Sequence, residues 1–597
     1  MNASALWFGP PQRPLFGRLY IPRGGVARGG VVLCPPFGYE SWRAGRAYRA
    51  LSGQLASEGF AVLHFDYDGT GDSAGPVDGP GRVEAWQRSI TEAVETMRHS
   101  GARHVSLVGL RLGATLASSV SASCRPDELV LWDPCESGRS YLREQTVLAA
   151  VYEQSPLGPA VATVSFAQNG PMAVETIGST YGPETARAIS ELRIGPVPAA
   201  LDGHVLALLR PGSPPRKALA EHLSEVHAEL ADAVGQEQML DIQYPDLFVP
   251  HGTLATIVNW LSYRSGEETS TIKQMGHQSA VIPDSDDGAV VEEVRQLGPN
   301  ELFGILARPV GQSWGPTIIL LNAGHIDHCG PSRLWVDFAR SWAAAGLQVL
   351  RVDTSGRGDS PARPGQDLDI VYSPEALDDV ADIVEAVSPG SPSKTVLMGL
   401  CSGGYHAIVA GAQLGAGGVL AVNPALWGRS REPEAVQSKG GRPSSRSPAT
   451  GSIRRARALA RRVLSNADDL FAGVPGRVRD GVRWWWVKRL SDGPRPGQLL
   501  ERLARQGADV FVICGVREGK VVRGGEEGGL RRLEKKGDFH MSILPGIDHS
   551  LFTRAALDQV RLLLTDHVIA RYGKPPNIEL QQLPATGTAP PHNVLTM

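Results

Sequence analysis

The chain has 597 residues, of which 42% are hydrophobic and 20% charged, and its formal net charge is −3. This length is too great for one ordinary core and predicts two to four domains of a globular protein. The near-neutral charge gives no basis for nucleic acid binding, and no run of about 18 apolar residues is available to span a membrane.

The N-terminal stretch MNASALWFGPPQRP lacks the basic and apolar regions of a signal peptide. The six cysteines are scattered through the chain, a distribution that fits a reducing compartment better than a disulfide framework. We therefore expect a cytoplasmic protein.

The predicted elements occur twice along the chain. LFGRLYIP at Leu15 returns as LFGILARP at Leu302, and DYDGTGDS at Asp66 returns as DTSGRGDS at Asp353, both 287 positions later. In each copy an apolar strand, a helix, a second apolar strand and another helix precede a third strand, which runs into the glycine-rich turn VGLRLGATLA or MGLCSGGYHA. The pattern predicts two copies of one α/β fold, each with a mostly parallel, doubly wound sheet covered by helices on both faces.

The repeat and the local composition also predict domain boundaries. We expect a first domain over residues 1–264, a polar linker over 265–290, a second domain over 291–572 with a helical cap at about 425–499, and a proline-rich, disordered tail over 573–597.

The two glycine-rich turns resemble the nucleophile elbow G-x-S-x-G of the α/β-hydrolase superfamily, with Arg111 and Cys401 at the middle position. More narrowly, the first copy is similar to hydrolases of exosortase and exopolysaccharide gene clusters with a PPF segment, GDS and a GLRLG elbow. The second copy resembles their GP-x-R, GDS and GLC-x-G type. The resemblance implies two tandem α/β-hydrolase domains and a role in making a polysaccharide or an acylated metabolite, but it does not fix the substrate.

The second copy carries residues for nucleophilic catalysis. In this superfamily the triad follows the order nucleophile, acid, histidine. After Cys401, Glu518 follows an apolar strand and His549 follows the next one, so we expect a Cys-His-Glu triad. A helix start and a neighbouring imidazole would lower the pKa of the thiol and produce a thiolate, while a glutamate would orient the imidazole.

Two alternatives and an oxyanion hole complete this prediction. Asp548 is the competing acid, and Ser402 is the competing nucleophile if Cys401 is a structural thiol. The oxyanion hole would combine the Ser402 N–H with an N–H of Ala323 or Gly324, in the loop Asn322–Ala323–Gly324 (here the oxyanion loop). His325 and His328 flank this loop, and we expect them to serve packing.

The first copy cannot use the same chemistry, because the Arg111 guanidinium has no lone pair with which to attack. We therefore expect a pseudo-hydrolase that scaffolds or binds. Arg111 would form a structural ion pair, for instance with Asp133, or would bind an anion. We expect Asp72 and Asp359, in the two GDS turns, to stabilise the connection from strand to helix.

These residues predict an enzyme that acts on an ester or thioester through an acyl-Cys401 intermediate and needs no cofactor or metal. The alternatives are an acyltransferase with a hydroxyl or amine acceptor, a peptidase, and a non-catalytic binding protein. The substrate would be a small-molecule or carrier-bound acyl group. The basic stretch RRARALARRV in the cap is a candidate docking site for an acyl carrier protein.

Overall fold

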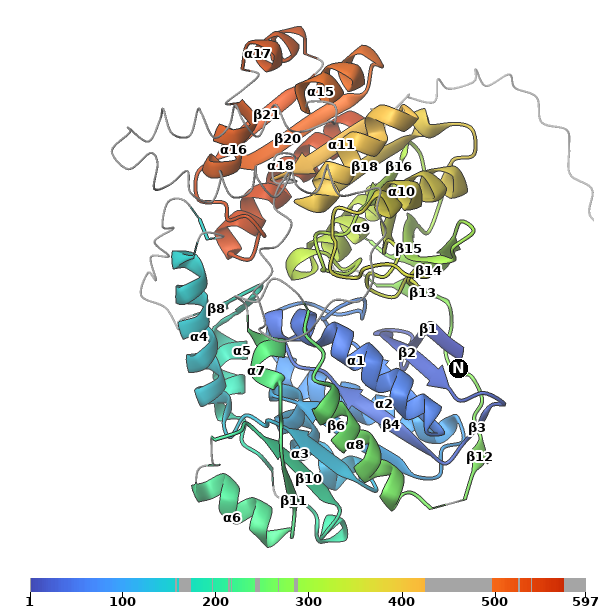
Figure 1. Cartoon of the computed structure of the whole chain (residues 1–597), viewed down its shortest axis with the longest axis vertical. Helices are drawn as coiled ribbons and strands as arrows, with labels where there is room; N and C mark the ends of the chain where they lie inside the picture. Colours follow the sequence, from blue (N-terminus) through green and yellow to red (C-terminus); the bar gives the residue numbers. More distant parts are fainter. Residues whose placement is uncertain are drawn as a thin grey trace, which may run out of the picture.

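Two β-sheets, one in each half of the sequence, form the frame of the structure, a computed structural model (Figure 1). We call residues up to 264 the first half and residues from 290 onward the second half. The residues that the structure describes are 2–155, 158–159, 173–195, 197–212, 215, 217–241, 247–266, 268–283, 288–424, 496–523, 527–537 and 539–573.

The first sheet has the strand order β1-β2-β5-β4-β6-β7-β10-β11. Its first two strands are antiparallel to their neighbours, and the strands from β5 onward pair in parallel. The strands are β1 (Asn2–Phe8), β2 (Leu15–Ile21), β4 (Gly29–Cys34), β5 (Phe60–Phe65), β6 (Val105–Leu110), β7 (Leu129–Trp132), β10 (Val205–Leu209) and β11 (Glu229–Asp232).

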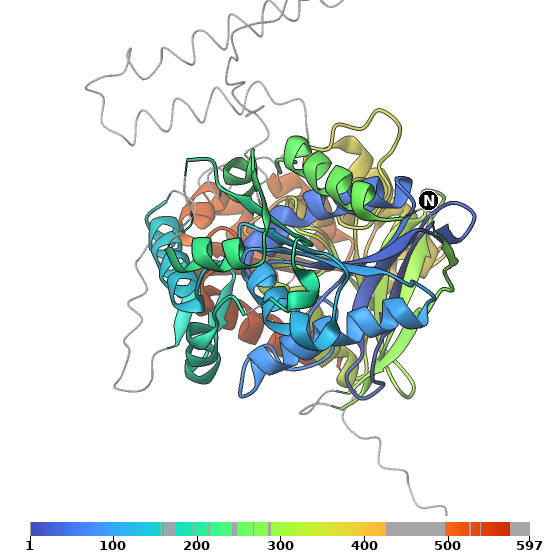
Figure 2. The same cartoon turned by 90° about the horizontal axis from the view of Figure 1, so that it is seen from below.

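Helices cover both faces of this sheet, as the view from below shows (Figure 2). One face packs against α1 (Tyr39–Ser57), α7 (Gln236–Leu240) and α8 (His251–Arg264), and the other against α2 (Arg82–His99), α3 (Leu112–Cys124) and α5 (Pro183–Glu191). The remaining strands and α-helices of this half are β3 (Val26–Ala27), α4 (Gly138–Gln154), the hairpin of β8 (Val174–Thr176) and β9 (Ser179–Tyr181), and α6 (Lys217–Glu225).

The second sheet repeats this strand order and has one more strand at its edge, β13-β14-β15-β17-β16-β18-β19-β20-β21. The strands from β17 onward again pair in parallel. The strands are β13 (Ser279–Ile282), β14 (Val290–Leu297), β15 (Leu302–Pro309), β16 (Thr317–Leu320), β17 (Gln348–Val352), β18 (Thr395–Leu400), β19 (Gly418–Val422), β20 (Asp509–Gly515) and β21 (His540–Leu544).

Its helices also divide between the two faces. α9 (Leu334–Ala344) and α18 (Arg554–Tyr572) pack on one face, and α10 (Pro374–Val387), α11 (Ser402–Leu414), α15 (Pro496–Arg505) and α17 (Glu527–Lys536) on the other. α16 (Val516–Arg523) follows β20. The strand order, the parallel core and the helices on both faces confirm the predicted fold class, two α/β sheets in tandem.

Local sequence explains these elements. The central strands β4, β6 and β18 are buried at every position, as continuous apolar runs in a doubly covered parallel sheet should be. Proline stands at the start of α5 and α10, where its fixed φ favours the first helical turn. At the start of α18 the Thr553 side chain accepts a hydrogen bond from the Ala556 N–H, a helix cap that stabilises by about 1 kcal/mol.

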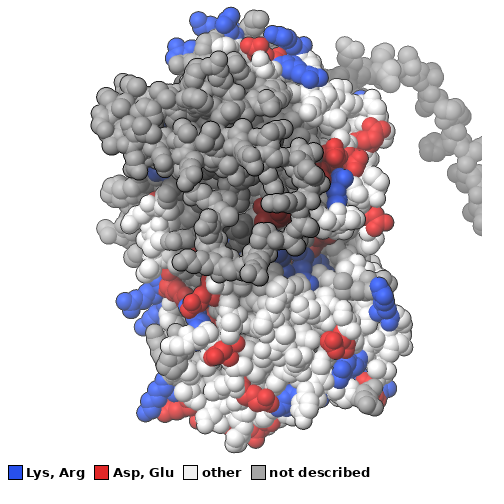
Figure 3. Space-filling view, viewed as in Figure 1, with Lys and Arg blue, Asp and Glu red and all other residues white. Residues whose placement is uncertain are grey.

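The segment predicted as a linker carries short strands of its own. β12 (Ser270–Thr271) pairs with β3 in the first half, and β13 pairs with β14 in the second. Most of the predicted cap (425–495) and almost all of the predicted tail (574–597) lie outside the described residues. None of the described helices combines the length and the apolar character that crossing a membrane requires. On the described part of the face in Figure 3, acidic and basic side chains are interspersed.

The two halves share a hydrophobic core. The cluster around α9 and α18 includes Trp7, Phe16 and Ile177 of the first half, all nearly inaccessible to solvent. Shared apolar burial of this kind fixes the halves against each other.

Candidate active site

The nucleophile elbow of the second half joins β18 to α11, with Cys401 between them. Cys401 has φ 55° and ψ −115°, a strained conformation for a residue other than glycine and one that this motif requires. A Cβ added to Gly399 would lie 2.2 Å from the Gly403 carbonyl carbon, and one on Gly403 would lie 2.3 Å from the Asn322 oxygen. The glycines thus permit the tight turn and its close approach to the oxyanion loop.

The structure brings the three predicted triad residues together. His549 Nε2 lies 3.2 Å from Cys401 Sγ, and His549 Nδ1 lies 3.1 Å from Glu518 Oε1. Glu518 stands in the first turn of α16, directly after β20, and His549 lies in the loop after β21. The carboxyl ends of the parallel strands therefore deliver all three side chains to one edge of the sheet.

The electrostatics of this group favour a thiolate and an imidazolium. Burial would raise the pKa of Cys401, but the hydrogen bond and charge of His549 outweigh it and lower that pKa below the ordinary thiol value. Burial alone would lower the pKa of His549, because it disfavours the charged imidazolium. The hydrogen bonds of His549 to Cys401 and Glu518 outweigh this effect and raise its pKa to about 10. For Glu518, the hydrogen bond from His549 overcomes burial and lowers the pKa of the carboxyl.

Two further residues that the sequence did not identify complete the site. The Tyr372 hydroxyl lies 3.6 Å from Cys401 Sγ, and burial followed by the Cys401 charge raises the pKa of that phenol. The hydroxyl therefore stays protonated and can donate to the thiolate. The Asn423 amide donates to the Asp548 and His549 carbonyls at 3.1 Å each and accepts from the Gly515 N–H at 2.7 Å. It thus fixes the loop of the histidine to the end of β20.

The oxyanion loop lies against the start of α11. The Gly324 N–H donates to Ser402 Oγ at 2.9 Å, so this predicted donor already has a partner. The Ser402 N–H lies at the thiol and contributes to lowering the pKa of Cys401. Ser402 N–H and Ala323 N–H therefore remain the candidate oxyanion donors, and Gly324 instead holds the loop to the elbow.

The competing residues are placed differently. Asp548 is fully buried and accepts from the Tyr152 hydroxyl at 2.8 Å and from the Phe552 N–H at 2.8 Å. The Asp548 carboxylate thus binds within the loop that follows it, whereas the Glu518 carboxylate contacts the imidazole of His549. The Ser402 hydroxyl oxygen accepts the hydrogen bond from the Gly324 N–H, and the imidazole of His549 contacts Cys401. The geometry thus favours Cys401 over Ser402 and Glu518 over Asp548.

Arg111 occupies the equivalent elbow of the first half with almost the same backbone, φ 57° and ψ −122°. Its guanidinium is 4% exposed and contacts Glu40 at 3.1 Å, Asp133 at 3.2 Å and Glu144 at 2.5 Å. Even with Arg210, which also pairs with Asp133, these carboxylates outnumber the positive charges, so the anion-binding alternative is not supported. The structural ion pair with Asp133 is the alternative that the geometry bears out.

Two clusters of possible metal ligands occur among the described residues, Asp72–His328–Cys329 and His328–Asp353–Asp359. Both imidazole nitrogens of His328 already lie 2.7 Å from a carboxylate, and Asp72 also pairs with Arg351. An imidazolium that donates from both nitrogens has no lone pair for a metal. Neither donor set therefore fits a metal ion.

Comparison with known proteins places this geometry in context. The family model described as serine aminopeptidase, S33, matches residues 316–468, a range that contains the elbow. Similar solved structures include DcsB in complex with its substrate analogue (14% identity, 44% of this chain and 100% of that chain, TM-score 0.32). Another is dienelactone hydrolase from Anabaena variabilis (13% identity, 48% and 98%, TM-score 0.29). A third is an esterase of Pyrococcus furiosus (13% identity, 48% and 91%, TM-score 0.29).

No curated protein matches the sequence. The family match and the strand order of the two sheets together support the α/β-hydrolase superfamily and an enzyme of the hydrolase class. The matched family is named for a serine, whereas this elbow carries Cys401.

Proposed function

We propose that the chain is an acyl-transfer enzyme that acts on an ester or thioester through an acyl-Cys401 intermediate. The observation that carries this proposal is the hydrogen-bonded series Cys401–His549–Glu518, with 3.2 Å and 3.1 Å between the bonded atoms. A lowered thiol pKa supports it, because the thiolate is the nucleophilic form.

In the first step the Cys401 thiolate attacks the acyl carbon and a carbon–sulfur bond forms. The carbonyl oxygen becomes an oxyanion, for which the N–H groups of Ser402 in the elbow and Ala323 in the oxyanion loop are the candidate donors. Collapse breaks the bond to the leaving alkoxide or thiolate, which takes the proton from His549 Nε2. Glu518 accepts from Nδ1 and stabilises the imidazolium until that transfer.

In the second step His549, now neutral, takes a proton from the acceptor as the acceptor attacks the acyl-cysteine. Collapse of this intermediate breaks the carbon–sulfur bond, releases the product and restores the Cys401 thiolate beside the His549 imidazolium. Water as acceptor gives hydrolysis, and a hydroxyl or amine gives transfer. The residues are the same in both cases, so product analysis with and without an added acceptor separates them. The likeness to hydrolases of polysaccharide clusters favours a biosynthetic setting, in which the first half serves as a scaffold.

The test is intact-protein mass spectrometry after mixing the full chain with a panel of acyl thioesters at neutral pH. We expect one acyl adduct, absent in Cys401→Ala and retained in Cys124→Ala, which removes a buried thiol of α3. A second candidate, a non-catalytic binding protein, predicts no adduct and a Cys401 that iodoacetamide labels no faster than free cysteine. That pair of results would reject the enzyme.

A further inference from the structure

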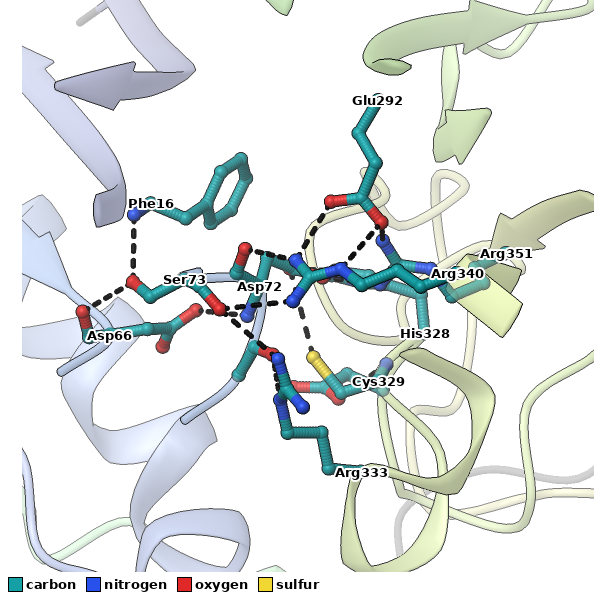
Figure 4. Close-up of polar contacts among 12 residues, drawn as sticks. Phe16, Asp66, Asp72, Ser73, Glu292, His328, Cys329, Arg333, Arg340 and Arg351 are labelled. Carbon is teal, nitrogen blue, oxygen red and sulfur yellow. Dashed lines mark hydrogen bonds and ion pairs between the residues drawn. The ribbon is translucent and has the colours of Figure 1, made fainter. Parts of the chain in front are cut away.

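A turn of the first half places a charged side chain, the Asp72 carboxylate, among residues of the second half. Asp72, in the turn after β5, is fully buried together with His328 and Arg351 of the second half (Figure 4). Its carboxylate pairs with Arg351 and accepts from His328 Nε2 at 2.7 Å. Since a buried carboxylate is costly unless paired, this placement depends on both partners.

Arginines of the second half hold the backbone of the same turn. Arg333 donates to the Gly71 oxygen at 2.7 Å, and Arg340 donates to the Asp72 oxygen at 2.7 Å. Glu292 accepts from Arg340 and Arg351 at 2.9 Å each, and together with Asp72 it balances their charge (Figure 4). The turn is therefore fixed in position relative to the second half.

These contacts correct the expected role of the two GDS aspartates. The turns are closed by other groups, since the Asp66 and Asp353 carboxylates accept from the backbone N–H of Asp72 and Asp359 at 3.0 Å and 2.9 Å. The carboxylates of Asp72 and Asp359 instead cross between the halves, and Asp359 pairs with Arg18 of the first half.

A hydrogen-bonded series continues from Asp72 toward the active site. His328 Nδ1 lies 2.7 Å from Asp353 Oδ2, and Asp353 Oδ1 accepts from Asn322 Nδ2 at 2.8 Å. Burial would lower the pKa of His328, but Asp353 and Asp72 outweigh it and raise that pKa, so the ring is an imidazolium that donates to both. We call Asp72–His328–Asp353–Asn322 the inter-half series.

The series ends at the oxyanion loop. Asn322 is the first residue of that loop, and its side-chain oxygen accepts from the Thr354 N–H at 2.7 Å. A Cβ built on Gly403 of the elbow would meet the Asn322 backbone oxygen first. The position of Asn322 thus sets where the next residue, Ala323, presents its N–H relative to Cys401.

We propose that Asp72 of the first half is a positioning residue for the oxyanion loop of the second half and acts through His328 and Asp353. This role rests on the proposed function, because it serves the oxyanion donor of the acyl transfer. Without Asp72, His328 Nε2 loses its acceptor and the imidazole can turn away from Asp353. Asp353 Oδ2 then keeps the Asp359 N–H as a donor but loses His328, so the carboxylate that holds Asn322 is less firmly positioned. The active site of the second half is then incomplete without the first half.

The test compares Asp72→Asn with Asp359→Asn in the full chain. The amide introduced by Asp72→Asn can accept through one oxygen only and turns an NH₂ group toward His328 or Arg351, so one link is lost. Asp359→Asn removes another pair between the halves, the partly buried one with Arg18, and the hydrogen bonds of the inter-half series do not run through the Asp359 side chain. Both variants remove an ion pair between the halves, and thermal unfolding checks that each is folded, which makes Asp359→Asn the control.

We expect Asp72→Asn to speed hydrogen–deuterium exchange in the peptide that contains the oxyanion loop and to slow acylation by on the order of 10- to 100-fold. The rate of alkylation of Cys401 by iodoacetamide should stay the same, because His549 and Glu518 are not in the series. In Asp359→Asn, loop exchange and acylation should keep wild-type values. The double variant Asp72→Asn/His328→Gln should be no slower than the slower single variant, since both break one series.

The proposal is overturned if loop exchange is unchanged in Asp72→Asn, if both aspartate variants affect the loop equally, or if the effects of Asp72→Asn and His328→Gln multiply. It is also overturned if the loop loosens while acylation by an active enzyme is unchanged. A wild-type chain that forms no acyl adduct would reject the proposed function alone, because the exchange comparison would still decide the positioning.

Discussion

Replacing His549 with glutamine should slow the alkylation of Cys401 strongly at low pH. In the wild type His549 lowers the pKa of the thiol despite burial. Without it the pKa should return to about 8.5 or higher, at which about 0.3% of the thiol is ionised at pH 6. Loss of the thiolate alone would lower the alkylation rate at pH 6 by up to about 300-fold. Thiolates of lower pKa are weaker nucleophiles, so the wild-type thiolate is intrinsically the less reactive one, and we expect a net fall on the order of 10- to 100-fold.

The assay is the rate of iodoacetamide labelling at Cys401 between pH 5 and 9, followed by peptide mass spectrometry. The wild-type rate should reach its plateau well below pH 8.5 and fall only as the pH drops through the lowered pKa. The control is His325→Gln, which removes an imidazole that contacts Arg357 and not Cys401. If the profile of His549→Gln coincides with that of the wild type, the thiolate–imidazolium pair does not exist.

Three further substitutions test the site. Glu518→Gln should slow acylation by up to about 10⁴-fold in single-turnover kinetics. Asp548→Asn should instead lower the melting temperature and leave the pH profile of Cys401 alkylation unchanged. The reverse pattern would make Asp548 the acid of the triad. Arg111→Met leaves the buried Glu40 carboxylate without its cation, while Asp133 and Glu144 keep Arg210, and should cost about 3–5 kcal/mol in urea unfolding, with no change in Cys401 labelling. Gly403→Ala puts a Cβ 2.3 Å from the Asn322 oxygen and should slow acylation far more than alkylation, and equal losses would contradict the close approach.

The fold class could be predicted because its signals are local and occur twice. Apolar strands such as β4 and β18 are buried throughout, so composition alone marks them as central. Glycines fix the elbow because no other residue allows its close approaches. The short strands β12 and β13 could not be predicted in the polar linker, since their pairing partners, β3 and β14, and not their residues, decide their conformation.

The candidate site was predicted less completely. Cys401, Glu518 and His549 each follow a strand that the sequence marks, so strand order brings them together. Tyr372 lies in a loop without such a marker. Asn423 had a signal, because it corresponds to Asp133 in the repeat, 290 positions apart. Asp72 meets His328 across a separation of 256 residues, and no local pattern encodes such a contact.

The covalent link between the halves changes what their interface must achieve. The segment from β12 to β13 is paired to β3 of the first half at one end and to β14 of the second sheet at the other, so docking is intramolecular. A short connection gives an effective concentration on the order of millimolar. An interface with several desolvated charges gains little affinity from them. Two separate subunits with this interface would nevertheless need tight binding to stay together. A fused chain does not, so its contact surface is free to be selected for orientation.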